Sequence, residues 1–329
     1  MMMMIRVGVG GWKVSPLLRG RWVRGIKTCI VGSGPAGFYV TEFLLKEFGK
    51  GVAVDMYDRL PVPYGLVRFG VAPDHPEVKA VTKNFDKLAE SEQVRFVGNV
   101  EVGRDVTVPE LQSHYDAVVF CSGCPRETRL GIPGSNLRGV FSAHEFVSWY
   151  NGHPDYTWKG DLRHAKSALV VGNGNVALDV ARILQAPLAL LAATDITQSA
   201  LEALRISSVR TVHVVGRRGP VQAAFTNKEM RELIKLEGCE TYMRESDLTL
   251  DATSAAVMKA ARPKARMHKL MRSAHVVDDL TFKDLVRQTS EGDSQSRRVF
   301  FHFRRSPVEY APRSTPDEAG MVGKVLSPG

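Results

Sequence analysis

Three glycines near the start of the chain have the spacing of a phosphate-binding turn. They are Gly32, Gly34 and Gly37, in the pattern G-x-G-x-x-G. In this pattern the first glycine permits a tight bend, the second lets the backbone approach a pyrophosphate, and the third allows close packing of helix on strand. A helix that begins after the turn directs free N–H groups and the positive end of its dipole at the phosphate. The turn is therefore a candidate pyrophosphate site.

An acidic residue lies where the ribose of such a dinucleotide would be bound. Asp58 follows Gly37 by about 20 residues, at the end of the apolar run 52–57, which is the usual spacing of a ribose-binding acid. A carboxylate there accepts a hydrogen bond from the ribose 2′-hydroxyl. We predict that the first turn binds an adenine dinucleotide without a 2′-phosphate. The alternative is a packing turn followed by a solvated aspartate.

A second turn of the same kind is followed by two arginines instead of an acid. It contains Gly172, Gly174 and Ala177, in the pattern G-x-G-x-x-A, and the next predicted strand runs into Arg217 and Arg218. A carboxylate at that position would repel a 2′-phosphate, whereas guanidinium groups bind one through paired hydrogen bonds. We therefore predict that the second turn binds NADPH. The alternative for the two arginines is a solvated charged turn.

The elements that must position these turns occur twice in the same order. Each turn is preceded by an apolar run, followed by a helix-like pattern, and then by another apolar run, which predicts two separate βαβ units. The predicted fold class is α/β, with two Rossmann-like dinucleotide-binding domains on parallel sheets. Two such domains in one chain predict a flavoprotein in which NADPH reduces FAD. The predicted segments are a leader at 1–26, an FAD-binding domain at 27–125, an NADPH-binding domain at 126–306 and a disordered tail at 307–329.

The basic charge is concentrated at the N-terminus. The formal net charge is +9, and residues 1–27 contain six of the basic residues and no acid. An Arg-rich leader without acids is typical of mitochondrial transit peptides, so we predict the mitochondrial matrix as the location. The alternatives are a disordered basic tail and a start codon assigned too far upstream.

The charge and hydropathy of the remaining chain exclude some functions. Its basic excess is too small to predict nucleic-acid binding. No apolar run reaches the roughly 18 residues that a membrane span needs, although peripheral association with a membrane stays open. No metal site is predicted.

Four strings in the chain resemble the adrenodoxin reductase family, which are mitochondrial NADPH:ferredoxin oxidoreductases. They are YGLVRFGVAPDHP at 64–76, GNVEVG at 98–103, GNVALDVAR at 174–182 and VGRRGP at 215–220. The resemblance extends from about residue 27 to about residue 307. It implies electron transfer from NADPH through FAD to a small iron–sulfur ferredoxin that is adrenodoxin-like.

The resemblance also implies roles for particular residues. The implied FAD contacts are Ala36, Asp58, Leu66 and Val102. The implied NADP contacts are Asn173, Gly174, Asn175, Val176, Arg217, Arg218 and Glu229. His75 and Asp179 match polar residues of the electron-transfer region, and the alternative for His75 is a turn histidine held by its neighbours.

The C-terminal part of the sequence departs from the family pattern. In the family the chain returns to complete the FAD domain with a Gly-Trp motif and a glycine-rich loop, and nothing after Phe303 resembles that segment. We therefore expect an incomplete FAD domain with an exposed apolar edge, and binding of NADPH in preference to FAD. The alternative function is that of a truncated, catalytically silent protein that binds NADPH or a partner.

Two further features suggest a partner and a competing activity. A run without acids contains Arg262, Lys264 and Arg266, and such a basic surface would dock an acidic ferredoxin; a solvated basic helix is the alternative. Cys121 and Cys124 form a C-x-x-C pair, which would suit a disulfide reductase similar to thioredoxin reductase. That alternative is disfavoured because the pair directly follows a buried strand.

Overall fold

The chain forms two compact units in a computed structural model. The structure describes residues 3–6, 25–124, 130–157, 160–290, 296–312 and 322–326. The first unit comprises Met1–Val71 and His75–Glu127, and the second comprises Ala72–Asp74 and Thr128–Gly329. The sequence-based boundary at residues 125 and 126 lies close to the later crossing, whereas the inclusion of Ala72–Asp74 in the second unit was not anticipated.

The first unit contains a five-stranded sheet in the order β1-β5-β2-β3-β4. All strands except β1 run parallel. The strands are β1 (Met3–Arg6), β2 (Ile26–Val31), β3 (Val52–Tyr57), β4 (Val94–Val97) and β5 (Ala117–Phe120). The helices are α1 (Pro35–Phe48), α2 (Leu66–Phe69), α3 (Pro76–Lys79), α4 (Thr82–Ala89) and α5 (Val108–His114), with a 3₁₀ turn at Gly49–Gly51.

Apolar side chains on both faces of this sheet are buried by helices. On one face Ile30 and Met56 pack with Phe38 of α1 and Phe85 of α4. On the other face, residues of β2 and β5 pack with Leu111 of α5. This two-sided burial explains why the strands read as continuous apolar runs in the sequence.

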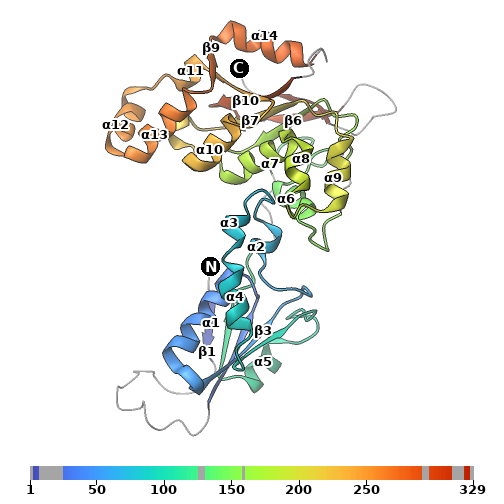
Figure 1. The fold of residues 1–329 in the computed structure, drawn as a ribbon, viewed down its shortest axis with the longest axis vertical. Coiled ribbons are helices and arrows are strands. Elements are labelled where there is room, and N and C mark those ends of the chain that lie inside the picture. Colours follow the sequence, from blue (N-terminus) through green and yellow to red (C-terminus); the bar gives the residue numbers. More distant parts are fainter. Residues whose placement is uncertain are drawn as a thin grey trace. The chain divides into compact units, whose positions relative to one another are not determined.

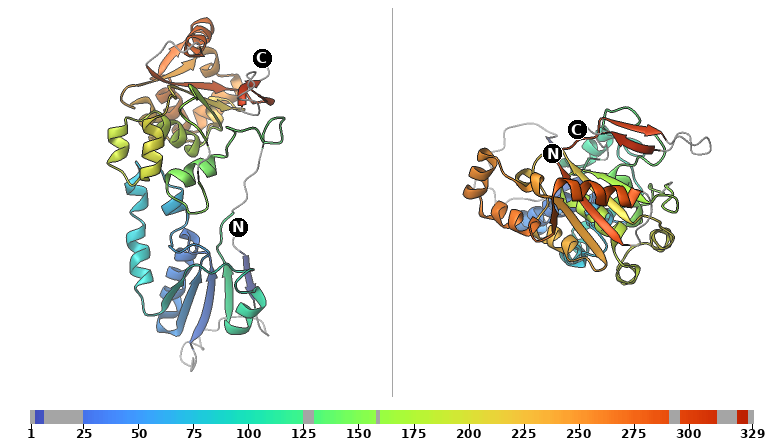
Figure 2. Two further views of the ribbon diagram at one scale, coloured as in Figure 1. Left: turned by 90° about the vertical axis from the view of Figure 1, so that its right-hand side faces the viewer. Right: turned by 90° about the horizontal axis from the view of Figure 1, so that it is seen from above.

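The N-terminal residues add a strand to the first sheet that was not predicted. Strand β1 pairs antiparallel with β5, with Met3 opposite Phe120 and Arg6 opposite Ala117, so β5 is not the edge of this sheet. Figure 2 shows this strand beside β5. Backbone pairing satisfies the N–H and C=O groups of the edge strand whatever the side chains are, so nothing in the leader residues indicated it. Residues 7–24 of the predicted leader lie outside the described residues.

The second unit is built on a fully parallel five-stranded sheet in the order β6-β7-β10-β8-β9. Its strands are β6 (Ser167–Val171), β7 (Thr211–Gly216), β8 (Cys239–Arg244), β9 (His275–Val277) and β10 (Arg297–Phe303). Its helices are α6 (Ala143–Tyr150), α7 (Asn175–Gln185), α8 (Leu188–Ala192), α9 (Gln198–Arg205), α10 (Asn227–Ile234), α11 (Glu245–Leu248), α12 (Ala252–Ala260), α13 (Arg262–Met271) and α14 (Asp279–Ser290), with a 3₁₀ turn, η3, at Pro220–Gln222.

Strand β10 lies inside this sheet and is buried on both faces. Figure 1 shows α7 and α10 on one face of the sheet and α14 on the other. Phe301 and Phe303 belong to the larger core with α7 and α10, while Phe300 packs with Phe282 of α14 and Tyr242. The α/β class with two parallel sheets, predicted from the sequence, is confirmed.

The segment after residue 306 contains regular structure that was not predicted. Strands β11 (Glu309–Pro312) and β12 (Val322–Leu326) pair antiparallel, so the expectation of disorder is wrong for these residues. The Tyr310 N–H donates to the Pro133 carbonyl at 2.9 Å, and the Tyr310 side chain is buried. One buried aromatic in so short a strand is too weak a pattern to recognise in the sequence. Across the described residues no helix combines the length and the apolar character that a membrane crossing would need.

Candidate functional site

The first glycine turn connects β2 to α1 and has space for a ligand at only one of its glycines. Gly32 has a φ of +103°, and a Cβ there would lie 2.5 Å from the Cys121 carbonyl oxygen. A Cβ at Gly37 would lie 2.2 Å from the Gly32 carbonyl oxygen, so helix and turn pack too closely for any side chain. A Cβ at Gly34 would meet nothing within 4 Å. The turn is therefore closed on the protein side and open at Gly34.

Asp58 holds this turn in shape. One carboxylate oxygen of Asp58 accepts hydrogen bonds from the backbone N–H and the hydroxyl of Ser33, at 2.8 and 2.6 Å. The other oxygen accepts from the Leu60 N–H at 3.0 Å. The carboxylate is half-buried and lies at the end of β3, where the sequence predicts a ribose contact. Ser33, which the sequence reasoning missed, is fully buried between the turn and Asp58.

The other predicted FAD contacts also lie in the first unit. Ala36 is exposed in the first turn of α1, and Leu66 is 66% exposed at the start of α2. The residue before Leu66 is next to the turn, since a Cβ at Gly65 would lie 3.0 Å from the Cα of Gly34. Val102 instead packs in the apolar cluster on the α5 face of the sheet.

The second glycine turn connects β6 to α7 with the same open geometry. Gly172 has a φ of +146°, a Cβ at Gly174 would meet nothing within 4 Å, and Ala177 is buried against the core. Gly174 is also the N-cap of α7 and supplies no side-chain cap. The first N–H groups of α7 are therefore available to a phosphate. Val176 is exposed in the first turn of the helix.

Asn173 lies between this turn and the end of β7. A Cβ on Gly216 would lie 1.7 Å from Asn173 Nδ2, so glycine is required where the Asn173 side chain crosses the strand end. Both polar atoms of the Asn173 amide are buried and have no hydrogen-bond partner among the described residues. Buried amides are normally satisfied, so this side chain suits a ligand or a water that supplies the partners.

Arg217 and Arg218 leave the sheet directly after Gly216. Both side chains are exposed, and neither guanidinium forms an ion pair within the part of the chain that the structure describes. Since β6 and β7 are parallel neighbours, the arginines and the glycine turn lie at the same edge of the sheet. This edge can bind a pyrophosphate and a further phosphate group together.

Strand β10 brings a second arginine pair to this edge. Arg304 and Arg305 follow β10, which is parallel to β7. The Arg304 N–H donates to the Arg218 carbonyl at 3.3 Å, and the Arg305 N–H donates to the Gly216 carbonyl at 3.1 Å. The sequence reasoning missed this pair, although paired arginines after an apolar run were the signal used at β7.

Besides the Arg304 contact to Arg218, three further hydrogen bonds attach the arginine loop, residues 217–226, to the glycine turn, α7 and α13. The Ala224 N–H donates to the Asn173 carbonyl at 2.8 Å, and the Thr226 N–H donates to Asn175 Oδ1 at 2.8 Å. Lys264 Nζ of α13 donates to the Ala223 carbonyl at 2.8 Å. The glycine turn and the arginine loop are therefore one connected structure.

A buried guanidinium joins two other predicted site residues. Arg182 of α7 is 3% exposed and donates to Asp74 at 2.5 and 3.0 Å, to Asp179 at 2.7 Å and to Glu229 at 3.0 Å. Burial alone would lower the pKa of Arg182, but the hydrogen bonds and charges of Asp74 and Asp179 raise it overall. Sequence reasoning missed this residue, although an arginine three positions after Asp179 on a helix was a usable signal.

The two residues predicted for the electron-transfer region belong to different units. Asp179 lies on α7 of the second unit, in contact with Arg182. His75 belongs to the first unit, where it is buried immediately before α3.

The C-x-x-C pair lacks the features of a redox site. Cys121 is buried at the end of β5, Cys124 is exposed, and no disulfide joins any of the four cysteines. Burial raises the pKa of the Cys121 thiol, which disfavours the reactive thiolate. The geometry does not support the disulfide-reductase alternative.

The predicted docking residues on α13 do not share one environment. Arg262 and Arg266 are exposed, as is Lys269 one turn further on. Lys264 is half-buried and its ammonium group is engaged with the Ala223 carbonyl. The grouping of Lys264 with the exposed arginines is therefore corrected, because its side chain points to the arginine loop.

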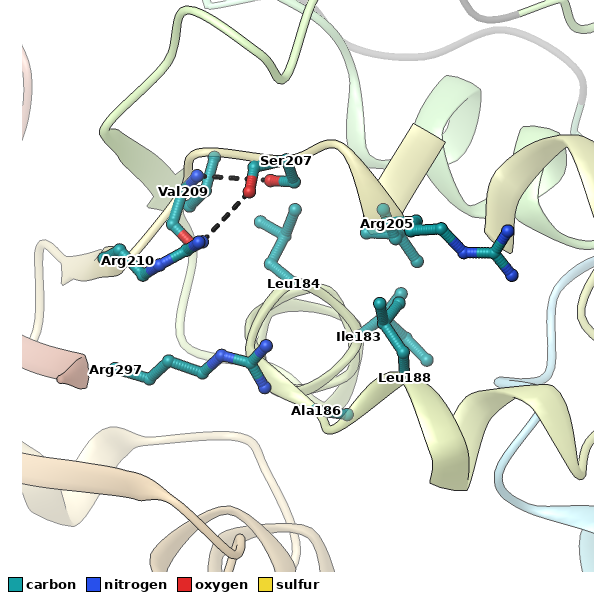
Figure 3. Close-up of a pocket in the computed structure, with 10 residues that line it drawn as sticks. Ile183, Leu184, Ala186, Leu188, Arg205, Ser207, Val209, Arg210 and Arg297 are labelled. Carbon is teal, nitrogen blue, oxygen red and sulfur yellow. Dashed lines mark hydrogen bonds between the residues drawn. The ribbon is translucent and has the colours of Figure 1, made fainter. Parts of the chain in front are cut away.

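A small pocket lies in the second unit near the end of α7, away from the glycine turn. It has a volume of about 50 Å³ and is lined in part by Arg205, Arg210 and Arg297. Figure 3 shows Arg205 directed away from the other two arginines. Arg297 Nη1 donates to the Gln185 carbonyl at 2.9 Å and so caps the end of α7. A volume close to that of one or two waters excludes a dinucleotide.

Both units thus have a parallel sheet with a glycine turn at its carboxyl edge, which defines a protein with two dinucleotide-binding folds. The family model described as pyridine nucleotide-disulphide oxidoreductase matches residues 26–254. The chain belongs to the pyridine nucleotide-disulphide oxidoreductase family, in its adrenodoxin reductase group.

Individual relatives support this assignment. The chain is 49% identical over 296 residues to NADPH:adrenodoxin oxidoreductase, mitochondrial, of Bos taurus, and 46% identical over 288 residues to the protein of the same name from Arabidopsis thaliana. These matches cover 90% and 87% of this chain, and 58% of either relative. The structure of Mycobacterium tuberculosis FprA in complex with NADPH superimposes with a TM-score of 0.78 at 39% identity, covering 93% of this chain and 68% of FprA.

Proposed function

We propose that this chain takes electrons from NADPH and passes them, through FAD, to an acidic iron–sulfur ferredoxin. The main observation in support is that the two glycine turns have neighbours of opposite charge. Arg217 and Arg218, which form no ion pair among the described residues, adjoin the second turn, and the carboxylate of Asp58 adjoins the first. The relatives named NADPH:adrenodoxin oxidoreductase support the same activity. Because the chain spans 58% of their length, the activity, cofactors and partner are proposed for it as a member of that group.

The second turn fits NADPH. The free N–H groups at the start of α7 would bind the pyrophosphate, with Gly174 allowing close approach. Arg217 and Arg218 would bind the 2′-phosphate through charge-assisted hydrogen bonds. The unsatisfied amide of Asn173 supplies further donors and an acceptor at the same edge.

The first turn fits FAD. Gly34 leaves its surface open, and the N-terminus of α1 has no side-chain cap. Asp58 lies at the end of β3, where a ribose hydroxyl would be bound. A flavin held there would supply the chemistry that links a two-electron hydride donor to a one-electron ferredoxin. Ala36, Leu66 and Val102 remain proposed contacts to it.

Within the second unit, Arg182 would orient two of the acids proposed for the site. It fixes Asp179 and Glu229 in one hydrogen-bonded cluster. Asp179 and His75 are the residues that we propose for the electron-transfer region. Glu229, on α10, is proposed to contact NADP.

A ferredoxin would dock on the exposed basic face of α13. Arg262, Arg266 and Lys269 lie at positions i, i+4 and i+7 of the helix, so they share one face. Opposite charge on the partner would steer association in a salt-dependent manner. The relatives are named mitochondrial, and with the basic leader this supports the mitochondrial matrix as the location.

Nucleotide titration of the purified chain tests the NADPH assignment. We expect NADP⁺ to bind more tightly than NAD⁺, and Arg217→Ala with Arg218→Ala to abolish that difference while NAD⁺ binding is retained. Equal weakening of both nucleotides in the variant would show that the arginines do not recognise the 2′-phosphate.

A further inference from the structure

Of the three predicted docking residues, Lys264 is the one whose side chain is directed at the arginine loop. Its Nζ donates to the Ala223 carbonyl at 2.8 Å, and its side chain is half-buried. Within the described residues its ammonium group forms no ion pair. Arg262 and Arg266, on either side of it in the sequence, are exposed. Lys264 therefore has a structural partner in the arginine loop.

The contacted carbonyl belongs to a buried part of that loop. Ala223 is 3% exposed and directly follows η3, which begins shortly after Arg217 and Arg218. The next N–H, that of Ala224, donates to the Asn173 carbonyl of the glycine turn. Lys264 and the glycine turn thus hold the same peptide group, the one between Ala223 and Ala224, through its carbonyl and its N–H.

Helix α13 is itself firmly anchored, so the position of Lys264 is determined by the core. Met267 and Met271 are 5% and 0% exposed and belong to the main core cluster. The helix also packs against α10 and η3. A charged donor on an anchored helix gives a hydrogen bond stronger than one between neutral groups.

We propose that Lys264 is a positioning residue for 2′-phosphate recognition, fixing through the Ala223 carbonyl the loop that presents Arg217 and Arg218. This inference rests on the proposed NADPH site. Nucleotides that lack the 2′-phosphate need the glycine turn and α7 but not the arginines. Loss of Lys264 therefore weakens NADP⁺ binding selectively, and it leaves ferredoxin docking on the exposed face of α13 unchanged.

The test is titration of the Lys264→Met chain with NADP⁺ and with NAD⁺. We expect the Kd for NADP⁺ to rise about fivefold, because the variant loses one charge-assisted hydrogen bond. The Kd for NAD⁺ should be unchanged. Lys264→Arg, which keeps the charge and the reach, should retain NADP⁺ affinity to within about twofold. Lys283→Met, which removes an exposed lysine on α14, is the matched control and should change neither Kd.

Several results would overturn this proposal. An unchanged NADP⁺ Kd in Lys264→Met would do so, as would equal losses for NADP⁺ and NAD⁺, which indicate a purely structural role. Retained NAD⁺ binding reports that the variant is folded, and Lys264→Gln replaces Lys264→Met if the latter does not fold. If Arg217→Ala with Arg218→Ala also leaves NADP⁺ binding unchanged, the proposed function fails; if only the Lys264 variants do, this inference alone fails.

Discussion

A single buried guanidinium holds three carboxylates of the second unit together. Arg182 contacts Asp74, Asp179 and Glu229 at 3.0 Å or less. Removing one partner of a buried ion pair costs the compensation of the other charge, and here three carboxylates would lose the guanidinium that they share. The cluster therefore matters for folding as well as for the proposed orientation of Asp179.

We predict that Arg182→Met lowers the free energy of unfolding by about 3–5 kcal/mol, the usual cost of breaking a buried pair. Arg182→Lys should lose less, because it keeps a charge but cannot reach all three acids. Urea denaturation followed by circular dichroism measures both. A loss below about 1 kcal/mol for Arg182→Met would mean that the acids relax into solvent.

Two histidines on adjacent strands make stability depend on pH. His213 Nδ1 and His302 Nε2 lie 3.0 Å apart, on β7 and β10. Burial lowers the pKa of His213 to about 4. Burial, then the charges of His213, Arg244 and Arg305, lowers the pKa of His302 to about 3. Both imidazoles are therefore neutral in the folded chain at neutral pH.

Because these pKa values are lower in the folded state than the unfolded value of about 6.5, the unfolded chain binds more protons below that pH. The pair has no effect above pH 6.5, and stability falls as the pH drops from 6.5 towards 4. We expect a slope of up to about 1.4 kcal/mol per pH unit for each histidine. Denaturation at pH 7, 6 and 5 should show a shallower slope in His213→Gln with His302→Gln. An equal slope in that variant would assign the effect to other groups.

At the scale of elements, the sequence predicted the strands whose side chains are apolar on both faces. The apolar runs before and after the two glycine turns correspond to β2 and β3 in the first unit and to β6 and β7 in the second. Strand β8 was missed because Glu240 and Arg244 interrupt its apolar pattern, and β9 because it is only three residues long.

The candidate site was predictable only where its residues lie in local patterns. Both glycine turns and the arginines after β7 could be recognised from their spacing. The contacts of Arg182 with Asp74 and of Lys264 with Ala223 join residues more than 40 positions apart. Side-chain patterns in one segment carry no information on such pairings, so these two contacts emerged only from the fold.

Substitutions at Gly34 and Gly37 of the first turn allow the effect on ligand binding to be measured separately from the effect on folding. A Cβ at Gly37 would meet the Gly32 carbonyl oxygen at 2.2 Å, whereas one at Gly34 would meet nothing within 4 Å. We predict that Gly37→Ala destabilises the first unit by about 1–3 kcal/mol through overpacking. Gly34→Ala should leave the melting temperature unchanged and weaken FAD binding. A destabilised Gly34→Ala would show that the turn is not open in solution.

For the molecule as a whole, the proposed function requires a docked partner as well as two bound dinucleotides. We predict that Arg262→Gln with Arg266→Gln weakens the binding of an acidic ferredoxin by about tenfold at low ionic strength, and much less in about 0.5 M salt. The control is Lys283→Gln, which also removes a positive charge from an exposed position, here on α14. An effect that is independent of salt, or equal in the control, would contradict docking on α13.

The central claim is that one chain carries two dinucleotide sites of different specificity. Titration of the chain with FAD in the presence of saturating NADP⁺, and with NADP⁺ in the presence of saturating FAD, tests it directly. The account predicts that neither nucleotide displaces the other, and that Arg217→Ala with Arg218→Ala weakens NADP⁺ binding while leaving FAD binding intact. Mutual displacement of FAD and NADP⁺, or loss of both in the arginine variant, would contradict it.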